Sequence, residues 1–159
     1  MPPKLHIERE PPKAEALSER AERLGSLLSL SYEPMLVWHL NGPIEFWNTG
    51  AERLYGFAPE EAIGHSSHAL LRTKFPIEFN AWIKQLKSER YWSGELRHAC
   101  KDGREVIVES RQQLLSDGTV IEVNRDVTER KQIEAALHKT EEQLMFFWRQ
   151  LFSLVTIQL

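Results

Sequence analysis

The stretch Thr119-Val-Ile-Glu-Val-Asn-Arg-Asp-Val-Thr-Glu-Arg-Lys-Gln-Ile-Glu134 joins two kinds of secondary structure without a loop between them. Its first half is rich in β-branched residues and predicts a strand at 119–125. Its second half is charged and predicts a helix that leaves the sheet. Because no glycine or proline separates the halves, we expect a movement of the strand to move the helix, whereas a flexible loop would absorb it.

A start signal for this helix lies where the strand ends. Asp126 is followed three residues later by Glu129, which is the spacing of a capping box. The carboxylate of Asp126 is expected to accept hydrogen bonds from the first helical N–H groups and to lie at the positive end of the helix dipole. We therefore predict that Asp126, Thr128 and Glu129 form a tight joint between strand and helix.

Residues 127–159 carry the pattern of a coiled coil. Apolar residues alternate spacings of four and three, a heptad seam with one weak position at Thr140. An unbroken helix of this length spans roughly 50 Å, too long to bury its seam on a small domain. We expect the seam to pair with a second copy; the alternative is that part of the helix folds back on the sheet. The seam consists of Ile133, Leu137, Thr140, Leu144, Phe147, Leu151 and Leu154.

The two ends of the chain differ from its middle. Residues 1–13 hold four prolines and several charges and predict a loose tail. Residues 14–31 predict an amphipathic helix, whose Leu17, Leu24 and Leu28 are expected to join the dimer contact. The last 15 residues are more apolar on all sides than a surface helix should be, which leaves open whether they belong to the dimer interface or dock a different partner.

The middle of the chain predicts an α+β fold. Strands are expected at Met35–Leu40, Ile44–Asn48, Trp92–Lys101, Arg104–Leu115 and Thr119–Arg125, and helices at Thr49–Tyr55, Pro59–Ile63, His65–Leu71 and Ile77–Ser88. Three X-Gly dipeptides predict hairpin turns, and Asn41-Gly42 predicts a type I′ turn with positive φ at both residues. Because Ala58 is a poor N-cap, the helix at Pro59 is expected to fray. A hairpin and a three-stranded meander are unstable alone, so one five-stranded antiparallel sheet with helices on one face is expected.

A series of motifs covers residues 32–131. They are Leu40-Asn-Gly-Pro-Ile-Glu-Phe-Trp-Asn48, Gly50-Ala-Glu-Arg-Leu-Tyr-Gly-Phe57, Pro59-Glu-Glu-Ala-Ile-Gly64, Trp92-Ser-Gly-Glu95, Lys101-Asp-Gly103 and Asp126-Val-Thr-Glu-Arg-Lys131. In order and spacing they resemble the PAS domain of bacterial signalling proteins, which would occupy residues 32–126. The resemblance implies a sheet in the order 2-1-5-4-3, a pocket between sheet and helices, and a role in sensing or dimerisation rather than catalysis.

Twelve residues are expected to line that pocket or, alternatively, to fill a close-packed core. Five tryptophans keep a planar ligand possible. The twelve are Trp38, Trp47, Leu54, Phe57, Ile63, Leu70, Leu71, Phe79, Trp82, Leu96, Val106 and Val108.

The residues that bind the known PAS cofactors are not found at the corresponding positions of this sequence. Haem-binding members carry a ligating histidine on the long helix before the meander, and residues 77–88 contain none. Light-sensing flavin members use a cysteine beside the early helices, whereas Cys100 lies near a hairpin turn. Haem and covalently bound flavin are therefore not expected, and the cofactor is none or unknown.

Other candidate residues favour ordinary roles. His65 and His68 share a helical face, as metal ligands do, but no acidic or sulfur partner lies at fixed spacing, so no metal site is expected. His39 is expected to face solvent. His138 lies in the long helix, where histidine kinases carry their phosphoacceptor, but lacks the acid-and-proline context of that site. The acids Glu60, Glu61 and Glu95 are expected at the surface.

Composition excludes several functions. The net charge of -3 gives no basic field for nucleic acid, and one cysteine allows no internal disulfide. No phosphate-cradling glycine loop is present, so an enzyme is not expected. No apolar run reaches membrane-spanning length, and a cytoplasmic location is expected. Two functions remain: the input module of a sensor histidine kinase, with a kinase core as output partner, or a ligand-free dimerisation scaffold.

Overall fold

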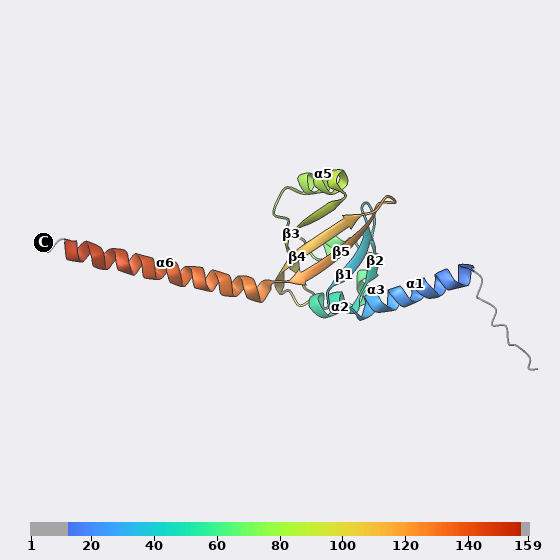
Figure 1. Ribbon diagram of the computed structural model, residues 1–159, viewed down its shortest axis with the longest axis horizontal. Coiled ribbons are helices and arrows are strands. Elements are labelled where there is room, and N and C mark those ends of the chain that lie inside the picture. The colour runs from blue at the N-terminus through green and yellow to red at the C-terminus, as the bar shows by residue number, and fades with distance from the viewer. Residues whose placement is uncertain (1–12, 157–159) are drawn as a thin grey trace, which may run out of the picture.

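The chain folds as one five-stranded antiparallel sheet with short helices on one face and a long helix at each end (Figure 1). This computed structural model describes the backbone of residues 13–156 and the side chains of residues 18–153. The strand order is β2-β1-β5-β4-β3, so the predicted α+β class and sheet order are confirmed. The last strand, β5, lies at the centre of the sheet.

The strands agree with prediction within two residues. They are β1 (Met35–His39), β2 (Ile44–Trp47), β3 (Tyr91–Ala99), β4 (Glu105–Leu114) and β5 (Thr119–Asp126). β1 joins the two halves of the sheet, because it pairs with β2 through Leu36 and Trp47 and with β5 through Val37 and Ile121. The hairpin and the meander therefore share one core, as expected.

The helices are α1 (Lys13–Leu30), α2 (Thr49–Tyr55), α3 (Pro59–Ala62), α4 (Ser67–Leu70), α5 (Phe79–Glu89) and α6 (Thr128–Thr156). The predicted tail lies outside the described residues except for Lys13, which begins α1. α3 has no side-chain cap from Ala58, but the carboxylate of Glu61 accepts from the Ala58 N–H at 3.0 Å. This bond stabilises the first turn of α3, and it was not considered when the helix was predicted to fray.

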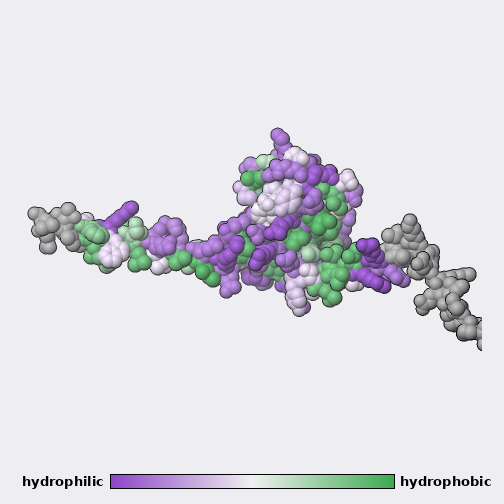
Figure 2. Space-filling model, viewed as in Figure 1, coloured by the Kyte–Doolittle hydropathy of each residue, from purple (hydrophilic) through white to green (hydrophobic). Residues whose placement is uncertain are grey.

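α6 points away from the sheet, and α1 leaves the domain at the opposite end (Figure 1). Val127 is buried, whereas Ile133 and Leu137 are 62% and 60% exposed. The alternative that the seam folds back on the sheet is therefore wrong. Hydrophobic and hydrophilic side chains mix along α6 (Figure 2), and no helix in the described part of the chain is both long and apolar enough to span a bilayer.

The turn at Asn41-Gly42 is not type I′, which corrects the prediction. Neither residue has positive φ, and the Gly42 N–H donates to the His39 carbonyl at 2.8 Å, so Leu40 and Asn41 are the central residues. The reason is Pro43, which restricts the backbone of the residue before it.

The other two hairpins have three-residue loops that end in a left-handed glycine. Gly103 has φ of 86° and Gly118 has φ of 91°. In each loop the preceding aspartate, Asp102 or Asp117, accepts from the N–H two residues later at 2.9 Å.

Asn48 fastens the end of α1 to the sheet, a role that the sequence analysis missed. Its Oδ1 accepts from the backbone N–H groups of Met35 and Ala51 at 2.8 and 2.9 Å. Its Nδ2 donates to the carbonyls of Leu28 and Glu33 at 3.1 and 2.9 Å. The side chain is 1% exposed, so these bonds are shielded from water.

Gly50 allows the α1–β1 link to pass close to α2. A Cβ at Gly50 would lie 2.6 Å from the Glu33 carbonyl oxygen, whereas one at Gly25 on α1 would meet nothing within 4 Å.

We predict that Gly50→Ala lowers the free energy of unfolding by about 1–3 kcal/mol. Gly25→Ala should instead be neutral or stabilise by up to about 1 kcal/mol. Urea unfolding of both variants checks this, and equal effects would contradict the close contact.

Candidate functional site

The inner face of the sheet carries a set of buried polar side chains. Strand alternation turns Val120, Glu122 and Asn124 of β5 toward the helices, and all three are at most 2% exposed. We call the set the inner polar network; it consists of Tyr55, His98, Ser110, Gln112, Glu122 and Asn124. None of these residues was a predicted site residue. Tyr55 lies on α2 and His98 on β3, and the other four lie on the inner face of β4 and β5.

Glu122 is the only acidic residue in the network. Its carboxylate accepts from the Trp38 indole N–H at 2.8 Å and from Asn124 Nδ2 at 2.9 Å. Ser110 and Gln112 also hydrogen-bond it. Burial raises the pKa of Glu122 above its usual value, and the hydrogen bonds oppose that rise.

A chain of hydrogen bonds runs from Glu122 to β3 through α2. Asn124 Nδ2 donates to the Tyr55 hydroxyl at 3.0 Å, and that hydroxyl lies 2.9 Å from His98 Nδ1. Burial lowers the pKa of His98 to about 3, so the ring is neutral at pH 7 and its Nδ1 accepts the hydroxyl proton. Burial also raises the pKa of Tyr55 well above its usual value. The chain thus links one helix to two strands.

A further bond ties α5 to the same network. The Trp82 indole N–H donates to Gln112 Oε1 at 3.1 Å, and Gln112 Nε2 lies 3.4 Å from the Ser110 hydroxyl. Helices α2 and α5 are therefore both attached to the central strands through buried side chains.

An aromatic cage surrounds His68 beside this network. The ring centroids of Trp38, Phe75, Phe79 and Trp82 lie 4.9, 5.2, 5.8 and 5.0 Å from that of His68. Two buried polar atoms in this part of the domain have no hydrogen-bond partner in the structure, His68 Nε2 and Asn124 Oδ1. Burial lowers the pKa of His68 to about 4.

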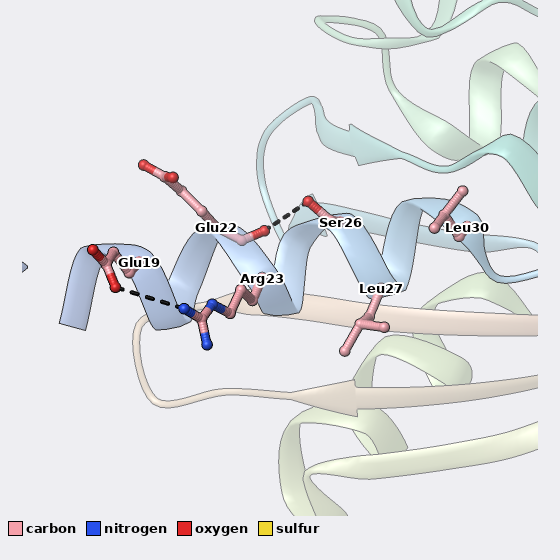
Figure 3. A pocket seen from close by; sticks show the side chains of 6 residues that line it. All are labelled: Glu19, Glu22, Arg23, Ser26, Leu27 and Leu30. Carbon is pink, nitrogen blue, oxygen red and sulfur yellow. Dashed lines mark hydrogen bonds and ion pairs between the residues drawn. The ribbon is translucent and has the colours of Figure 1, made fainter. Parts of the chain in front are cut away.

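An open hollow of about 460 Å³ borders the cage. Trp38, His68 and Phe79 form part of its lining, and the rest comes from the β1–β2 turn and the segment around α4. Figure 3 shows a different hollow of about 500 Å³ along α1. Since all of its lining comes from one helix, including the Glu19–Arg23 pair at 3.7 Å, it cannot enclose a ligand.

The twelve predicted pocket residues fall into three groups. Buried in the core are Trp38, Trp47, Leu71, Trp82, Leu96, Val106 and Val108. Leu54, Phe57 and Leu70 pack against that core and are partly buried. Ile63 is 45% exposed and lines neither the core nor the hollow, which corrects the prediction, whereas Phe79 is 47% exposed and lines the hollow beside the cage. Ile63 ends α3 in an extended conformation that turns it outward, and Phe79 begins α5 at the rim of the cage.

The other candidate residues have mostly structural contacts. His39 is half-buried rather than solvated, because its Nε2 lies 3.0 Å from the Asp117 carbonyl. The Cys100 thiol is buried and donates to the Leu54 carbonyl at 3.3 Å. His65 is exposed, so it does not join His68 in a site. Residues 18–153 contain no group of three or more potential metal ligands.

The surface acids are exposed as expected, but two of them form ion pairs. Glu61 lies 2.5 Å from Lys101 Nζ. Glu95 on β3 lies 2.5 Å from Nζ of Lys131 on α6. The second pair fastens the first turns of α6 to the sheet.

The joint differs from the predicted capping box. The first helical bond runs from the Lys131 N–H to the Val127 carbonyl, so Val127 is the N-cap and Asp126 precedes it. Asp126 Oδ1 still accepts from the Thr128 N–H at 2.9 Å. Glu129 makes no return bond to Asp126 in the described structure.

β4 holds the joint from the side. The Val127 N–H donates to the Ile107 carbonyl at 2.9 Å, and the Ile107 N–H donates to the Thr128 hydroxyl at 2.9 Å. The strand therefore passes into the helix with its backbone bonded to the neighbouring strand throughout.

The seam residues are exposed where they are described. Leu144, Phe147 and Leu151 are 54%, 58% and 38% exposed, and Leu24 and Leu28 of α1 are also exposed. The side chains of Leu17 and Leu154 lie outside the described residues.

Residues 28–132 match the family model described as the PAS fold. The chain belongs to the PAS family. The sensor protein FixL of Bradyrhizobium diazoefficiens is 27% identical in an alignment that covers 89% of this chain and 30% of FixL. The chain thus spans less than a third of that relative's length.

Solved PAS domains have the same architecture. One from Colwellia psychrerythraea is 28% identical with a TM-score of 0.57, covering 72% of this chain and 98% of that one. A domain of a sensory box sensor histidine kinase/response regulator from Geobacter sulfurreducens has a TM-score of 0.58 over 69% of this chain and 96% of that one; at 17% identity this shows the fold alone. The protein therefore contains a PAS domain, and its fold is also that of the Geobacter sulfurreducens domain.

The buried histidines predict a loss of stability in acid. In the unfolded chain His68 binds a proton as the pH falls through 6.5, whereas in the folded PAS domain its pKa is about 4. Its contribution is therefore complete above pH 6.5 and is lost as the pH falls toward 4, at most roughly 3 kcal/mol. His98 acts in the same direction. The raised pKa of Glu122 acts oppositely, lowering stability as the pH rises above 4.5.

His68→Phe isolates one contribution, because it keeps a ring in the cage and removes the titrating group. We predict a smaller fall in the free energy of unfolding between pH 6.5 and 4 than in the unaltered chain, measured by urea unfolding. His65→Phe is the control on the exposed neighbouring position and should keep the full fall. Identical pH profiles for His68→Phe and the unaltered chain would contradict the assignment.

Proposed function

We propose that this PAS domain senses a signal in its interior and passes it through β5 and the joint to a coiled coil formed by α6. The inner polar network carries this proposal, because Glu122 and Asn124 lie on β5 within four residues of Asp126. A change in the hydrogen bonds of Asn124 acts on the strand that enters α6. The bonds of Ile107 to the joint and the Glu95–Lys131 pair leave little slack between strand and helix.

The proposed output is a histidine kinase core in a longer parent protein. The likeness to the sensor protein FixL and to sensor histidine kinase domains supports this choice. We propose that the chain acts in the cytoplasm by binding and transmission rather than by catalysis, and that it neither binds nucleic acid nor inserts directly into a membrane. A ligand-free dimerisation scaffold is the alternative, supported by the many core side chains that are fully buried.

The exposed seam supports a homodimer. The leucines and aromatic residues at heptad spacing that the structure describes are exposed, and a second α6 would cover them. We propose a parallel pair, to which the apolar face of α1 adds contacts.

Neither haem nor covalently bound flavin suits the residues that are present. α5 carries no histidine for an axial bond to iron, and Nδ1 of the interior His98 already bonds the Tyr55 hydroxyl. The Cys100 thiol lies beside a hairpin and bonds a backbone carbonyl. The cofactor of this PAS domain is therefore proposed to be none or a ligand of another class.

We predict that purified protein shows no haem Soret band. An absorbance spectrum combined with native mass spectrometry tests this and also separates a ligand sensor from an empty scaffold. Stoichiometric haem that is lost in His68→Ala would overturn the proposal for the cofactor.

The joint is tested in a fusion to a histidine kinase core. Asp126→Ala removes the acceptor for the Thr128 N–H, a loss of roughly 1 kcal/mol, and Val127→Gly adds backbone freedom at the N-cap. Because a domain is stabilised by about 5–15 kcal/mol, both variants should stay folded and dimeric yet lose regulation of the kinase.

Asp117→Ala is the matched control, since Asp117 makes the same bond to the N–H two residues later, in the β4–β5 hairpin at the other end of β5 from the joint. It should lower the melting temperature slightly and keep regulation. Retained regulation in both Asp126→Ala and Val127→Gly would rule out transmission through the joint.

Lysine substitutions in the seam test whether it forms the dimer contact. Leu137→Lys with Leu144→Lys should weaken self-association by about a hundredfold, or roughly 3 kcal/mol, because two buried contacts become repelling charges. Ala135→Lys with Glu142→Lys has the same spacing on the outer face of α6 and should leave the dimer intact. Sedimentation equilibrium measures both, and an unchanged dimer in the first variant would exclude the seam.

A further inference from the structure

The ring of His68 occupies a position that suits a cation. Four aromatic centroids lie within 6 Å of its own, the distance at which a ring attracts a positive charge. The ring itself is neutral at pH 7, because burial lowers its pKa to about 4. An imidazolium here would bury an N–H without a partner, since Nε2 has none. A cation whose charge is spread over methyl groups has no such N–H.

The adjoining network holds a buried carboxyl group, that of Glu122, without a positive partner. The hydrogen-bond partners of Glu122 are Trp38, Ser110, Gln112 and Asn124, all of them neutral. A buried carboxylate is costly without a counterion, so a bound cation would offset that cost. Trp38 links the two features, because its ring is a wall of the cage and its N–H donates to Glu122.

The cage is open to a ligand on one side. The hollow of about 460 Å³ reaches Trp38, His68 and Phe79, and no lysine or arginine lies among the described residues that line it. His68 belongs to α4, a helix of four residues, and Arg72 just after it has a positive φ of 45°. This short segment therefore carries backbone strain next to the cage.

We propose that the aromatic cage binds a small organic cation, a methylated ammonium in preference to a neutral or acidic molecule, which takes the place of the His68 ring. This inference rests on the proposed sensing function and names the class of its ligand. Occupation of the cage moves Trp38 and thereby alters the hydrogen bonds of Glu122 on β5.

Choline and its uncharged isostere 3,3-dimethyl-1-butanol test the charge preference on the 159-residue chain. Isothermal titration, with tryptophan fluorescence as a second readout, should give saturable choline binding about tenfold or more tighter than binding of the alcohol. The anion 3,3-dimethylbutyrate should not bind. Equal affinity for choline and the alcohol overturns the proposal.

Four variants locate the site. His68→Ala empties the cage and should raise choline affinity by about tenfold, whereas Phe79→Leu removes an exposed wall and should lower it by about fivefold. Glu122→Gln keeps the side-chain shape, removes the charge, and should weaken choline but not the alcohol. His65→Ala, outside the cage, should change neither.

Absence of choline binding to both the unaltered chain and His68→Ala overturns the inference, as does equal choline affinity in Glu122→Gln and the unaltered chain. Neither outcome bears on transmission through the joint, which the Asp126 variants test separately in the kinase fusion.

Discussion

The carboxylate of Glu122, buried at the centre of the sheet, constrains the rest of the PAS domain. Its hydrogen bonds come from β1, β4 and β5, so these strands must keep their register to satisfy it. Loss of one partner would leave a buried charge or amide unsatisfied, at a cost larger than the net gain of an ordinary hydrogen bond. Through Asn124 and Tyr55 the same requirement extends to α2 and β3. A polar interior of this kind favours one arrangement of the elements over others of similar packing.

That arrangement bears on function because the strand at its centre is also the strand that becomes a helix. β5 ends at Asp126 and α6 begins at Thr128, with the intervening Val127 buried and bonded to β4. A small rotation of the strand is not absorbed by a loop. It is carried by a helix of 29 residues, so a small change at the sheet becomes a large displacement at the far end.

The sequence predicted the architecture well because its signals are local. β-Branched residues marked the last strand, and Asp102-Gly103 and Asp117-Gly118 marked two of the turns. The first turn was assigned wrongly, since the effect of Pro43 on Gly42 outweighed the hairpin signal. The N-cap of α6 was predicted at Asp126 but lies at Val127. The carbonyl that accepts the first helical bond depends on contacts with the neighbouring strand, which the local sequence does not show.

The candidate site was harder to predict because it depends on contacts between distant segments. Most of the tryptophans and aliphatic residues assigned to the interior lie there, but this followed from hydrophobicity alone. The polar residues of the network were passed over because hydrophobic alternation favours Ile121 and Val123 as the inward residues of β5, whereas the structure turns Glu122 and Asn124 inward and leaves Ile121 40% exposed. The Asn48 side chain bonds five backbone groups in the stretch from α1 to α2, and no local sequence pattern predicts such a set of contacts.

The most direct test of coupling between the interior and α6 is amide hydrogen exchange at the joint in the variant Glu122→Gln. Glu45→Gln, at an exposed position of β2, is the control. The account predicts that the amides of Ile107, Val127 and Lys131 exchange about tenfold faster or more in Glu122→Gln, while those of Ile63 and Gly64, which bond the carbonyls of Pro59 and Ile44, keep their protection. Unchanged protection at the joint in a variant that has lost the carboxylate charge would contradict the account.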